Sequence, residues 1–506
     1  MIPAVEVRAD GHTLPDGCRV RAVRVARRLS QPAQCELTLQ DPQGRAVELL
    51  GAAITVRVGG DAEDLFAGDV TGVDVVRAAD GEAGSRVVAY DALHRLRKRQ
   101  TPRCLEHVDA AELAEAVAAG LGVTVDADER GPRFERVLQH RQRDLELLTT
   151  TLARVGLSVV LDDRRLRLIS TRGHGEPIVL QYGRDLHRAE ISASLERAAA
   201  RCEASAWRPR TADLLTAAAE RPGSGRDIKL RPQSTSGGGG TAGTLALLDT
   251  SAADVEELRA VAQAALDVSD ARTVVFDGVA AGRPRLRAGA RVRVDGVAAA
   301  LDGTYVLTEV VTTVDADGYL ATLSSRPAER PADRGGARLT LGTVTDVADP
   351  DGCGRVRVRL GAVAGLDLGW LPVLTPGAGG GRGLVVLPDV GDAVLVALPQ
   401  DAFGAAVVLG SLFGAAAAPD RAGVRGGRVR RWSLRTGAGQ SIVVDDDDKS
   451  LRLENDAGSY VELGPDLLRL HAATDLVLEA PGHGITVKAA TVDFEHSTVD
   501  IPGGRT

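Results

Sequence analysis

The stretch that decides the fold lies near the C-terminus, where residues 441–471 read SIVVDDDDKSLRLENDAGSYVELGPDLLRLH. Short apolar–polar–apolar triplets recur from here onward, with Asp, Gly, Asn or Pro in most of the gaps. The triplets open, in order, at Val443, Leu451, Tyr460, Leu468, Leu476, Ile485, Val492 and Val499. They follow one another at intervals of seven to nine residues. Internal periodicity of this kind is typical of a repeat architecture built from short strands.

Two arrangements fit this repeat. Its period is too short for a full turn of a single-chain solenoid, but it suits one side of a three-sided prism wound from three chains. Each strand of such a prism pairs with neighbouring chains, so that few strand edges are exposed. A meander of hairpins within one chain is the alternative, although its strands are usually longer. For the prism, the expected trimer interface consists of Leu451, Leu453, Leu468, Leu470, Leu476, Leu478, Ile485, Val487, Val492 and Phe494.

The composition describes a chain of several domains with many short strands and turns. Its 506 residues exceed the roughly 100–200 of one domain, and it has 58 Gly but only 3 Trp, 5 Tyr, 6 Phe and a single Met. So few aromatic side chains disfavour stacking platforms for bases or sugars. The net charge of −8 provides no electrostatic footprint for a nucleic acid. The five cysteines form no C-x-x-C pair, which disfavours a zinc ribbon and a disulfide framework.

The order of patterns along the chain predicts four segments. Period-2 alternation through the first hundred residues indicates half-buried antiparallel strands. Asp109 and Asp144 stand where each can cap a following helix, and a third helix is expected at 252–268. A Gly-rich run at 217–243 predicts a flexible loop. The four segments are a hub at 1–330, a compact β unit at 337–414, a basic linker at 415–435 and a spike at 436–506.

Residues 344–413 resemble the OB-fold domain of the VgrG and phage gpV/gp5 spike family. The matching residues are Asp349-Pro-Asp-Gly352, Arg355-Val-Arg-Val358, Trp370, Pro388, Val390-Gly-Asp392, Val394 and Gly410-Ser-Leu412. A Pro-x-Val-Gly-Asp-x-Val stretch followed at this distance by Gly-Ser-Leu is a specific pattern. The resemblance implies an OB fold for 337–414.

The N-terminal part is similar to the gp27-like baseplate-hub domain that late-control proteins share. Tyr90-Asp-Ala-Leu-His-Arg-Leu96 matches a family stretch, 144–157 matches its capped helix, and 289–319 matches its closing β-barrel. Many members have His where this chain has Thr312 and Thr313, which is a departure. The tail is similar to the family's spike helix. The implied fold is mainly β with a few helices: gp27-like hub β-barrels, an OB-fold domain and a C-terminal trimeric triple-stranded β-helix.

This resemblance implies the central spike, or hub, of a contractile injection system. Such a spike caps the inner tube of the particle and pierces the target envelope when the sheath contracts. The implied partners are two further copies of the chain, a hexameric Hcp-like inner-tube protein, a PAAR-type tip protein and baseplate wedge or LysM-type hub proteins. Phage relatives can insert a lysozyme domain after the OB fold, but only 415–435 intervene here. The resemblance therefore implies a structural protein and no enzyme.

Two other classes of function stay open on the residues alone. A β-helical polysaccharide-active enzyme needs an acid pair in a cleft, and an OB-type nucleic-acid binder needs a basic aromatic face. We assign no catalytic, cofactor-binding or metal-binding residue. The tail histidines His471, His483 and His496 lack the His-x-His spacing with which some related spikes hold a metal.

Three charge runs are more simply explained by structure than by binding. The aspartates at 445–448 fit a solvated turn between two strands. The cationic run at 94–103 fits a solvated face or a contact with an acidic neighbouring protein, because no aromatic residues interleave with it. The arginines at 421–435 are expected to pack against a carboxylate-rich partner or an adjoining chain.

The sequence also bears on where the protein assembles. The N-terminal MIPAVEVRADGH lacks the basic and apolar regions of a signal peptide, and no stretch has the roughly 20 apolar residues of a membrane span. We therefore expect cytoplasmic assembly into a phage-tail-like particle, which can be released from the cell, with no integral membrane segment.

Overall fold

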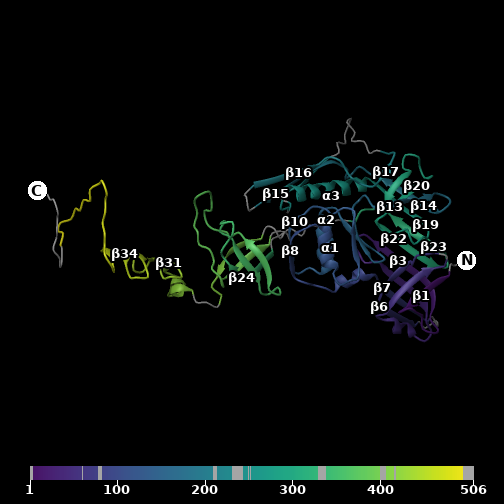
Figure 1. Ribbon diagram of the computed structural model, residues 1–506, viewed down its shortest axis with the longest axis horizontal. Coiled ribbons are helices and arrows are strands. Elements are labelled where there is room, and N and C mark those ends of the chain that lie inside the picture. Colours follow the sequence, from purple (N-terminus) through teal and green to yellow (C-terminus); the bar gives the residue numbers. More distant parts are fainter. Residues whose placement is uncertain are drawn as a thin grey trace. The chain divides into compact units, whose positions relative to one another are not determined.

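Two compact units make up the chain, Met1–Leu412 and Phe413–Thr506. The computed structural model describes residues 4–59, 61–77, 83–208, 213–230, 243–248, 250, 252–328, 338–398, 406–414 and 418–493, and Figure 1 shows it as a ribbon. Strands dominate both units, and the longer helices all lie in the first. No helix among the residues described is both long enough and apolar enough to cross a membrane.

The hub is built on one eleven-stranded sheet of order β14-β19-β23-β22-β3-β4-β7-β6-β5-β1-β2. Its strands are β1 (Val5–Ala9), β2 (His12–Thr13), β3 (Arg19–Arg28), β4 (Gln34–Gln40), β5 (Ala53–Val58), β6 (Phe66–Arg77), β7 (Ala83–Tyr90), β14 (Leu186–Ala193), β19 (Val274–Ala281), β22 (Glu309–Asp315) and β23 (Gly318–Ser324). A 3₁₀ turn, η1, covers Arg45–Leu49. The pairing of β3 with β22 joins the first strands of the chain to strands almost 300 residues later, for instance at Val25 and Thr312.

Period-2 patterning explains these strands, and the prediction of a mainly β hub is confirmed. In β5 every second residue is buried, and Ile54, Val56 and Val58 enter a core shared with β3, β4 and β7. Pairing between the described strands leaves this sheet open at β14 and β2, so the barrel closure expected from the resemblance is not seen.

A helical layer follows the first strands. The helices are α1 (Ala110–Ala118) and α2 (Asp144–Arg154), with β8 (Arg103–Val108) paired to β10 (Phe134–Gln139) and a sheet of β11 (Ser158–Asp162), β12 (Arg165–Ile169) and β9 (Thr124–Ala127). The predicted cap of α1 is confirmed, because Asp109 accepts from the amide of Glu112 while the Glu112 carboxylate accepts from the amide of Asp109, both at 2.9 Å.

The predicted cap of α2 is wrong. Arg143 occupies the N-cap position, and Asp144 is the first helical residue, with its side chain fully buried. Arg99 and Arg103 each approach the Asp144 carboxylate to 2.9 Å, and Gln139 donates to it at 2.7 Å. Burial works against the charge, but these donors hold the pKa of Asp144 below its ordinary value. Sequence patterns place Asp144 beside a helix start, but they cannot show that two distant arginines enclose it.

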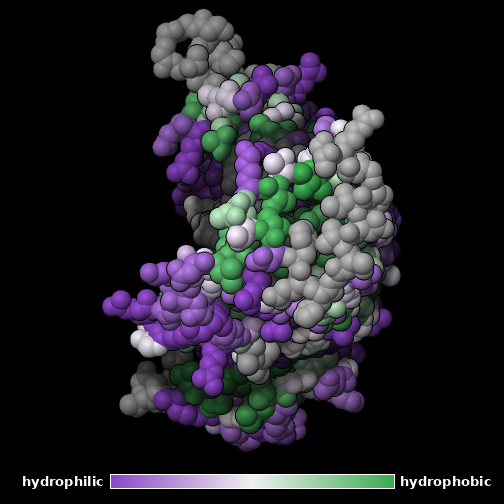
Figure 2. Space-filling view, turned by 90° about the vertical axis from the view of Figure 1, so that its left-hand side faces the viewer, coloured by the Kyte–Doolittle hydropathy of each residue, from purple (hydrophilic) through white to green (hydrophobic). Residues whose placement is uncertain are grey.

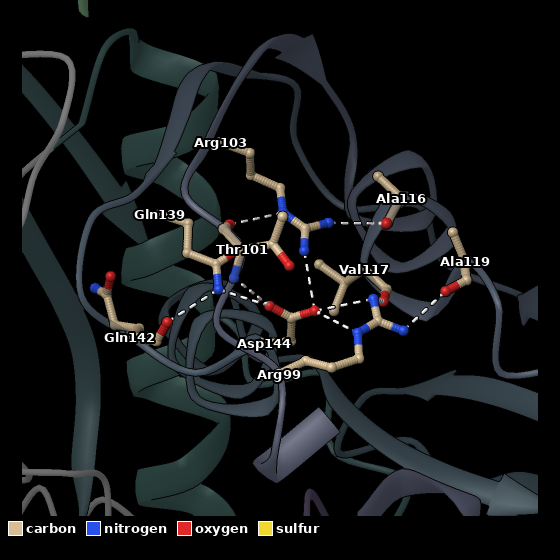
Figure 3. A network of polar contacts seen from close by, with 9 residues as sticks. All are labelled: Arg99, Thr101, Arg103, Ala116, Val117, Ala119, Gln139, Gln142 and Asp144. Carbon is tan, nitrogen blue, oxygen red and sulfur yellow. Dashed lines mark hydrogen bonds and ion pairs between the residues drawn. The ribbon is translucent and has the colours of Figure 1, made fainter. Parts of the chain in front are cut away.

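The same arginines join the two helices. Arg99 donates to the carbonyl oxygens of Val117 and Ala119, and Arg103 donates to that of Ala116, so both guanidinium groups satisfy carbonyls at the end of α1 (Figure 3). In the same cationic run, Arg95 makes two hydrogen bonds to Asp69, at 2.8 and 2.9 Å. Much of the run at 94–103 is therefore paired within the hub.

The Tyr90–Leu96 stretch forms a corner after β7 and continues into the 3₁₀ turn η2 (Ala92–Arg97). The buried Asp91 carboxylate accepts from the amides of Ala33 and Leu93, at 2.9 and 3.0 Å. The His94 ring donates from Nδ1 to the carbonyl oxygen of Asp91 at 2.7 Å. These contacts explain the residue types of the stretch as requirements of a tight corner.

The second half of the hub has two smaller sheets and the longest helix. One sheet is β13 (His174–Gln181), β20 (Ala290–Asp295), β21 (Gly303–Val306) and β17 (Asp227–Ile228), and the other is β16 (Asp213–Ala219), β15 (Ala199–Arg208) and β18 (Gly243–Leu247), which packs on α3 (Val255–Thr273). In the first sheet, Tyr305 is buried beside Phe276 and donates to the carbonyl oxygen of Leu301. The loop predicted at 217–243 is interrupted by β16, β17 and β18, and its residues 231–242 lie outside the described ones.

The OB domain is a five-stranded sheet of order β26-β25-β24-β27-β28. Its strands are β24 (Arg338–Asp346), β25 (Val356–Leu360), β26 (Leu366–Leu371), β27 (Ala393–Leu398) and β28 (Val407–Leu412). An isolated parallel bridge between Val373 and Val408 ties the outer strands together. Asp349 folds the β24–β25 loop by accepting from the amide of Cys353 and from the Arg355 side chain, and these bonds lower its pKa. The predicted OB fold is confirmed.

The second unit is a meander of five short antiparallel strands, β31 (Arg431–Arg435), β32 (Ser441–Asp445), β33 (Ser450–Glu454), β34 (Tyr460–Leu463) and β35 (Leu468–His471). It follows a 3₁₀ turn, η5 (Pro419–Gly423), and a two-stranded ribbon of β29 (Val424–Arg425) and β30 (Arg428–Val429). Residues 472–493 are described and contain no strand. A single chain thus forms the meander at 431–471, while the later repeats have no partner strands within it.

The buried Asp144 predicts a large effect of a small substitution. Asp144→Asn removes the charge that Arg99 and Arg103 share, and breaking a buried ion pair costs about 3 kcal/mol or more. We expect chemical denaturation to show a loss of this size in the free energy of unfolding of the hub. Glu146→Gln is the control, because Glu146 is exposed on the same helical turn and should change it little. Equal effects of the two substitutions would contradict the assignment.

The buried Asp91 predicts a pH dependence. Burial raises the pKa of Asp91 to about 7, so between its unfolded pKa near 4 and pH 7 the folded state holds a proton that the unfolded state lacks. The free energy of unfolding should therefore fall as the pH rises from 5 to 7, by at most about 1.4 kcal/mol per pH unit from this group. We expect denaturant titrations at several pH values to show that the free energy of unfolding changes less with pH in Asp91→Asn than in the wild type. Asp16→Asn is the control, because Asp16 is exposed, and it should match the wild type. Parallel profiles for all three proteins would rule out Asp91 as the source.

Candidate functional site

The register of the tail meander places its apolar side chains on one face. Residues opposite one another in an antiparallel pair share a face, so the pairings define two continuous rows across all five strands. We call their members the apolar tail face: Trp432, Val444, Leu451, Leu463 and Leu468 in one row, and Leu434, Ile442, Leu453, Val461 and Leu470 in the other.

The side chains of this face are exposed among the described residues. Trp432 and Leu468 are both 67% exposed and Leu470 is 50% exposed, although each lies in a strand that is hydrogen-bonded to its neighbour in the sheet. Apolar surface is also visible among hydrophilic side chains in the space-filling view of Figure 2. Contiguous exposed apolar surface on a strand-rich unit marks a site of interaction with another protein.

The structure places the predicted trimer-interface residues in two groups. Leu451, Leu453, Leu468 and Leu470 lie together on the apolar tail face. A second group is exposed within 472–493, outside any strand, and consists of Leu476, Leu478, Ile485, Val487 and Val492. Phe494 lies outside the described residues.

Sequence reasoning missed six members of this face: Trp432, Leu434, Ile442, Val444, Val461 and Leu463. The alternation of apolar and polar residues at 431–435 and 441–445 already indicates this face. The triplets were placed to begin at Val443 and Tyr460, however, each one residue before a member of the face. Both of these side chains lie on the opposite face. Only the cross-strand register distinguishes the two choices.

The opposite face is polar and internally paired. The Arg452 guanidinium donates to Glu454 and Glu462, both at 3.1 Å, and lies 3.8 Å from the centre of the Tyr460 ring. The Tyr460 ring in turn stacks on that of His471 with 4.9 Å between ring centres. The sheet therefore presents a face of paired charges and an apolar face whose side chains are largely exposed among the described residues.

The aspartate run and the basic linker pair with each other. Asp445 ends β32, is 3% exposed, and accepts from the amides of Asp447 and Asp448 and from Arg431 Nε, the last at 2.7 Å. These bonds lower the pKa of Asp445. Arg425 and Arg430 approach Asp447 to 3.7 and 3.6 Å. The run is a turn, as predicted, and the described carboxylates that Arg425, Arg430 and Arg431 meet belong to the same chain.

The OB domain has an apolar outer face of its own. Pairing places five side chains together on the outside of β24, β27 and β28: Leu339, Leu341, Leu395, Ala397 and Val407. Leu339 and Leu341 of β24 are 58% and 55% exposed. Val394 and Val396 of the adjacent strand β27 lie on the opposite face of the sheet and are fully buried.

Histidine, cysteine and carboxylate side chains are the candidate metal ligands in the parts of the chain that the structure describes. There, no group of three or more His, Cys, Asp or Glu side chains is arranged to hold a metal ion. Of the tail histidines, His471 stacks on Tyr460, His483 is exposed, and His496 lies outside the described residues. What the arrangement offers is surface for assembly.

Comparisons with known proteins agree with this fold. The family model described as phage tail baseplate hub (GPD) matches residues 26–318, and that described as type VI secretion system/phage-baseplate injector OB domain matches residues 340–413. No curated protein sequence matches the chain.

Two solved structures have a similar fold at low identity, with TM-scores above 0.5. The E. coli c3393 protein, a type VI secretion component described as similar to the T4 bacteriophage tail proteins gp27 and gp5, is 15% identical with a TM-score of 0.55, covering 80% of this chain and 100% of its own. The Francisella PdpA–VgrG complex is 7% identical with a TM-score of 0.55, covering 92% and 79%. A 43 kDa prophage MuSo2 tail protein of Shewanella oneidensis is 16% identical with a TM-score of 0.47, covering 64% and 98%.

The match to the hub model spans more than half of the chain, and the match to the OB model follows it in the sequence. The eleven-stranded hub sheet and the five-stranded OB sheet lie within or overlap the residues that these two models match. The chain belongs to the phage tail baseplate hub family.

Proposed function

We propose that this chain is the central spike of a contractile injection system and works as a homotrimer. The observation that carries the proposal is the apolar tail face, which runs unbroken across five strands and is uncovered in one chain. A hub-family chain that carries such a sheet needs a cover for it. Two further copies provide that cover, because each copy offers the same apolar rows around a threefold axis.

The size of the apolar face fits a stable association. Fully burying a large aliphatic side chain is worth about 1.5–3 kcal/mol, and the face carries ten apolar residues of each chain. The polar tail face would remain in water, since Arg452 already has its carboxylate partners there. Leu476, Leu478, Ile485, Val487 and Val492 would extend the same interface beyond β35 once neighbouring chains supply strands for 472–493 to pair with.

The outer face of the OB domain gives a second surface for the same assembly. Leu339 and Leu341 are too exposed to contribute to the OB core, and we assign them to contacts between OB domains of neighbouring copies. Two separate surfaces in one chain would engage together, because binding at the first raises the effective concentration at the second.

In the complete particle, we propose that the hub ring caps a hexameric Hcp-like inner tube and meets baseplate wedge or LysM-type proteins. The spike would carry a PAAR-type tip and pierce the target envelope when the sheath contracts. Assembly would take place in the cytoplasm. The role assigned to the chain is mechanical, since strands paired within each chain at 431–471 and between chains at 472–493 would resist buckling under a compressive load.

Leu470→Asp tests the trimer through the apolar tail face. An aspartate at this position would place three like charges near the axis, so native mass spectrometry should find monomers, and limited proteolysis should cleave 441–493 quickly. Arg469→Asp is the control, because Arg469 precedes Leu470 in β35 and faces the polar side. It should keep the wild-type mass and resistance. A Leu470→Asp protein that matches the wild type in both measurements would remove the apolar tail face from the interface.

A further inference from the structure

The two-stranded antiparallel sheet of β8 and β10 lies between two hydrophobic cores of the first unit. Its strands pair Leu138 with Cys104 and Val137 with Leu105, so these two pairs point to opposite faces. Val137 and Leu105 pack into the core of α1 and α2. Leu138, by contrast, belongs to the core of the OB domain, where it is 1% exposed, and Cys104 packs beside it.

A polar contact joins the same face of the β8–β10 sheet to the OB domain. Arg136 Nη1 of β10 donates to the carbonyl oxygen of Leu368 at 2.5 Å, and Glu106 of β8 approaches the same guanidinium group at 3.1 Å. Leu368 is itself a core residue of the OB domain. The hub therefore reaches a backbone group in the middle of β26, more than 200 residues along the chain.

The residue after Leu368 is shaped for this approach. Gly369 has a φ of 67°, in the left-handed region that favours glycine, and a Cβ on it would lie 2.7 Å from Arg136 Nη2. The backbone conformation at position 369 thus favours glycine, and a Cβ there would require the end of the Arg136 side chain to shift.

We propose that the two-stranded β8–β10 sheet is a docking element that completes the OB core, so that the OB domain is fully stable only while the hub holds it. A two-stranded sheet alone is only marginally stable in water, so this one takes its stability from the cores on its two faces. The partner that it fits is an OB domain with glycine after an accessible carbonyl on β26. Hub and OB domain then move as one rigid piece, which suits a baseplate component that transmits force.

The first test compares two adjacent core residues of β10 in the full-length protein by hydrogen exchange with peptide resolution. Leu138→Ala should speed exchange in β24–β28 by about thirtyfold or more, as expected for a buried leucine truncated in a core. Val137→Ala is the matched control, since it faces the hub core and should speed exchange mainly in α1 and β9–β12. The proposal is overturned when Leu138→Ala leaves β24–β28 at wild-type rates, or when the two variants affect those strands equally.

The second test is a double-mutant cycle. It separates the interaction between two residues from the effect that each substitution has alone, including a loss of stability in one variant. Gly369→Ala in the wild-type background meets Arg136, whereas in the Arg136→Ala background only the cost of the positive φ remains. Gly369→Ala should therefore speed exchange in β25 and β26 several-fold less when Arg136 is already replaced. Strictly additive effects would show that Arg136 and Gly369 do not meet in solution and would contradict the docking.

Discussion

The exposed apolar tail face is the constraint on which the rest of the account depends. Strand pairing puts Ile442, Leu453, Val461 and Leu470 in one row, and a row of that kind cannot stay in water without cost. Besides the meander, the described residues of the second unit contain only a 3₁₀ turn and the two-stranded β29–β30 ribbon. In the proposed trimer, two further copies of the chain would cover the apolar tail face.

The charged runs of this chain serve its own fold. Arg99 and Arg103 close on Asp144 and hold the end of α1, and the linker arginines close on Asp445 and Asp447. In each case a cationic run and an acidic group that lie apart in the sequence satisfy one another. Within the described residues, these charges therefore contribute to the fold of the chain itself.

Much of the fold follows from local patterns in the sequence, and the misses have physical causes. Alternation predicted the strands of the hub, the capping box at Asp109 predicted α1, and the OB motif predicted β24–β28. Asp144 was misjudged because a buried ion pair depends on residues far away in the chain. Four of the ten residues of the apolar tail face follow from the leucine triplets, while Trp432 and Val444 required the register between strands, which no single repeat contains. The docking of Leu138 in the OB core had no local signal at all, because its strand also faces the hub core on the other side.

The central claim, that three copies bury the apolar tail face against one another, is tested most directly by the mass of the purified protein in solution. Multi-angle light scattering on the eluting full-length chain should give about 158 kDa, three times the 52.8 kDa of one chain, across a range of dilutions. A mass that stays at 52.8 kDa at every concentration would contradict the account, because the apolar tail face would then be stable without a second copy.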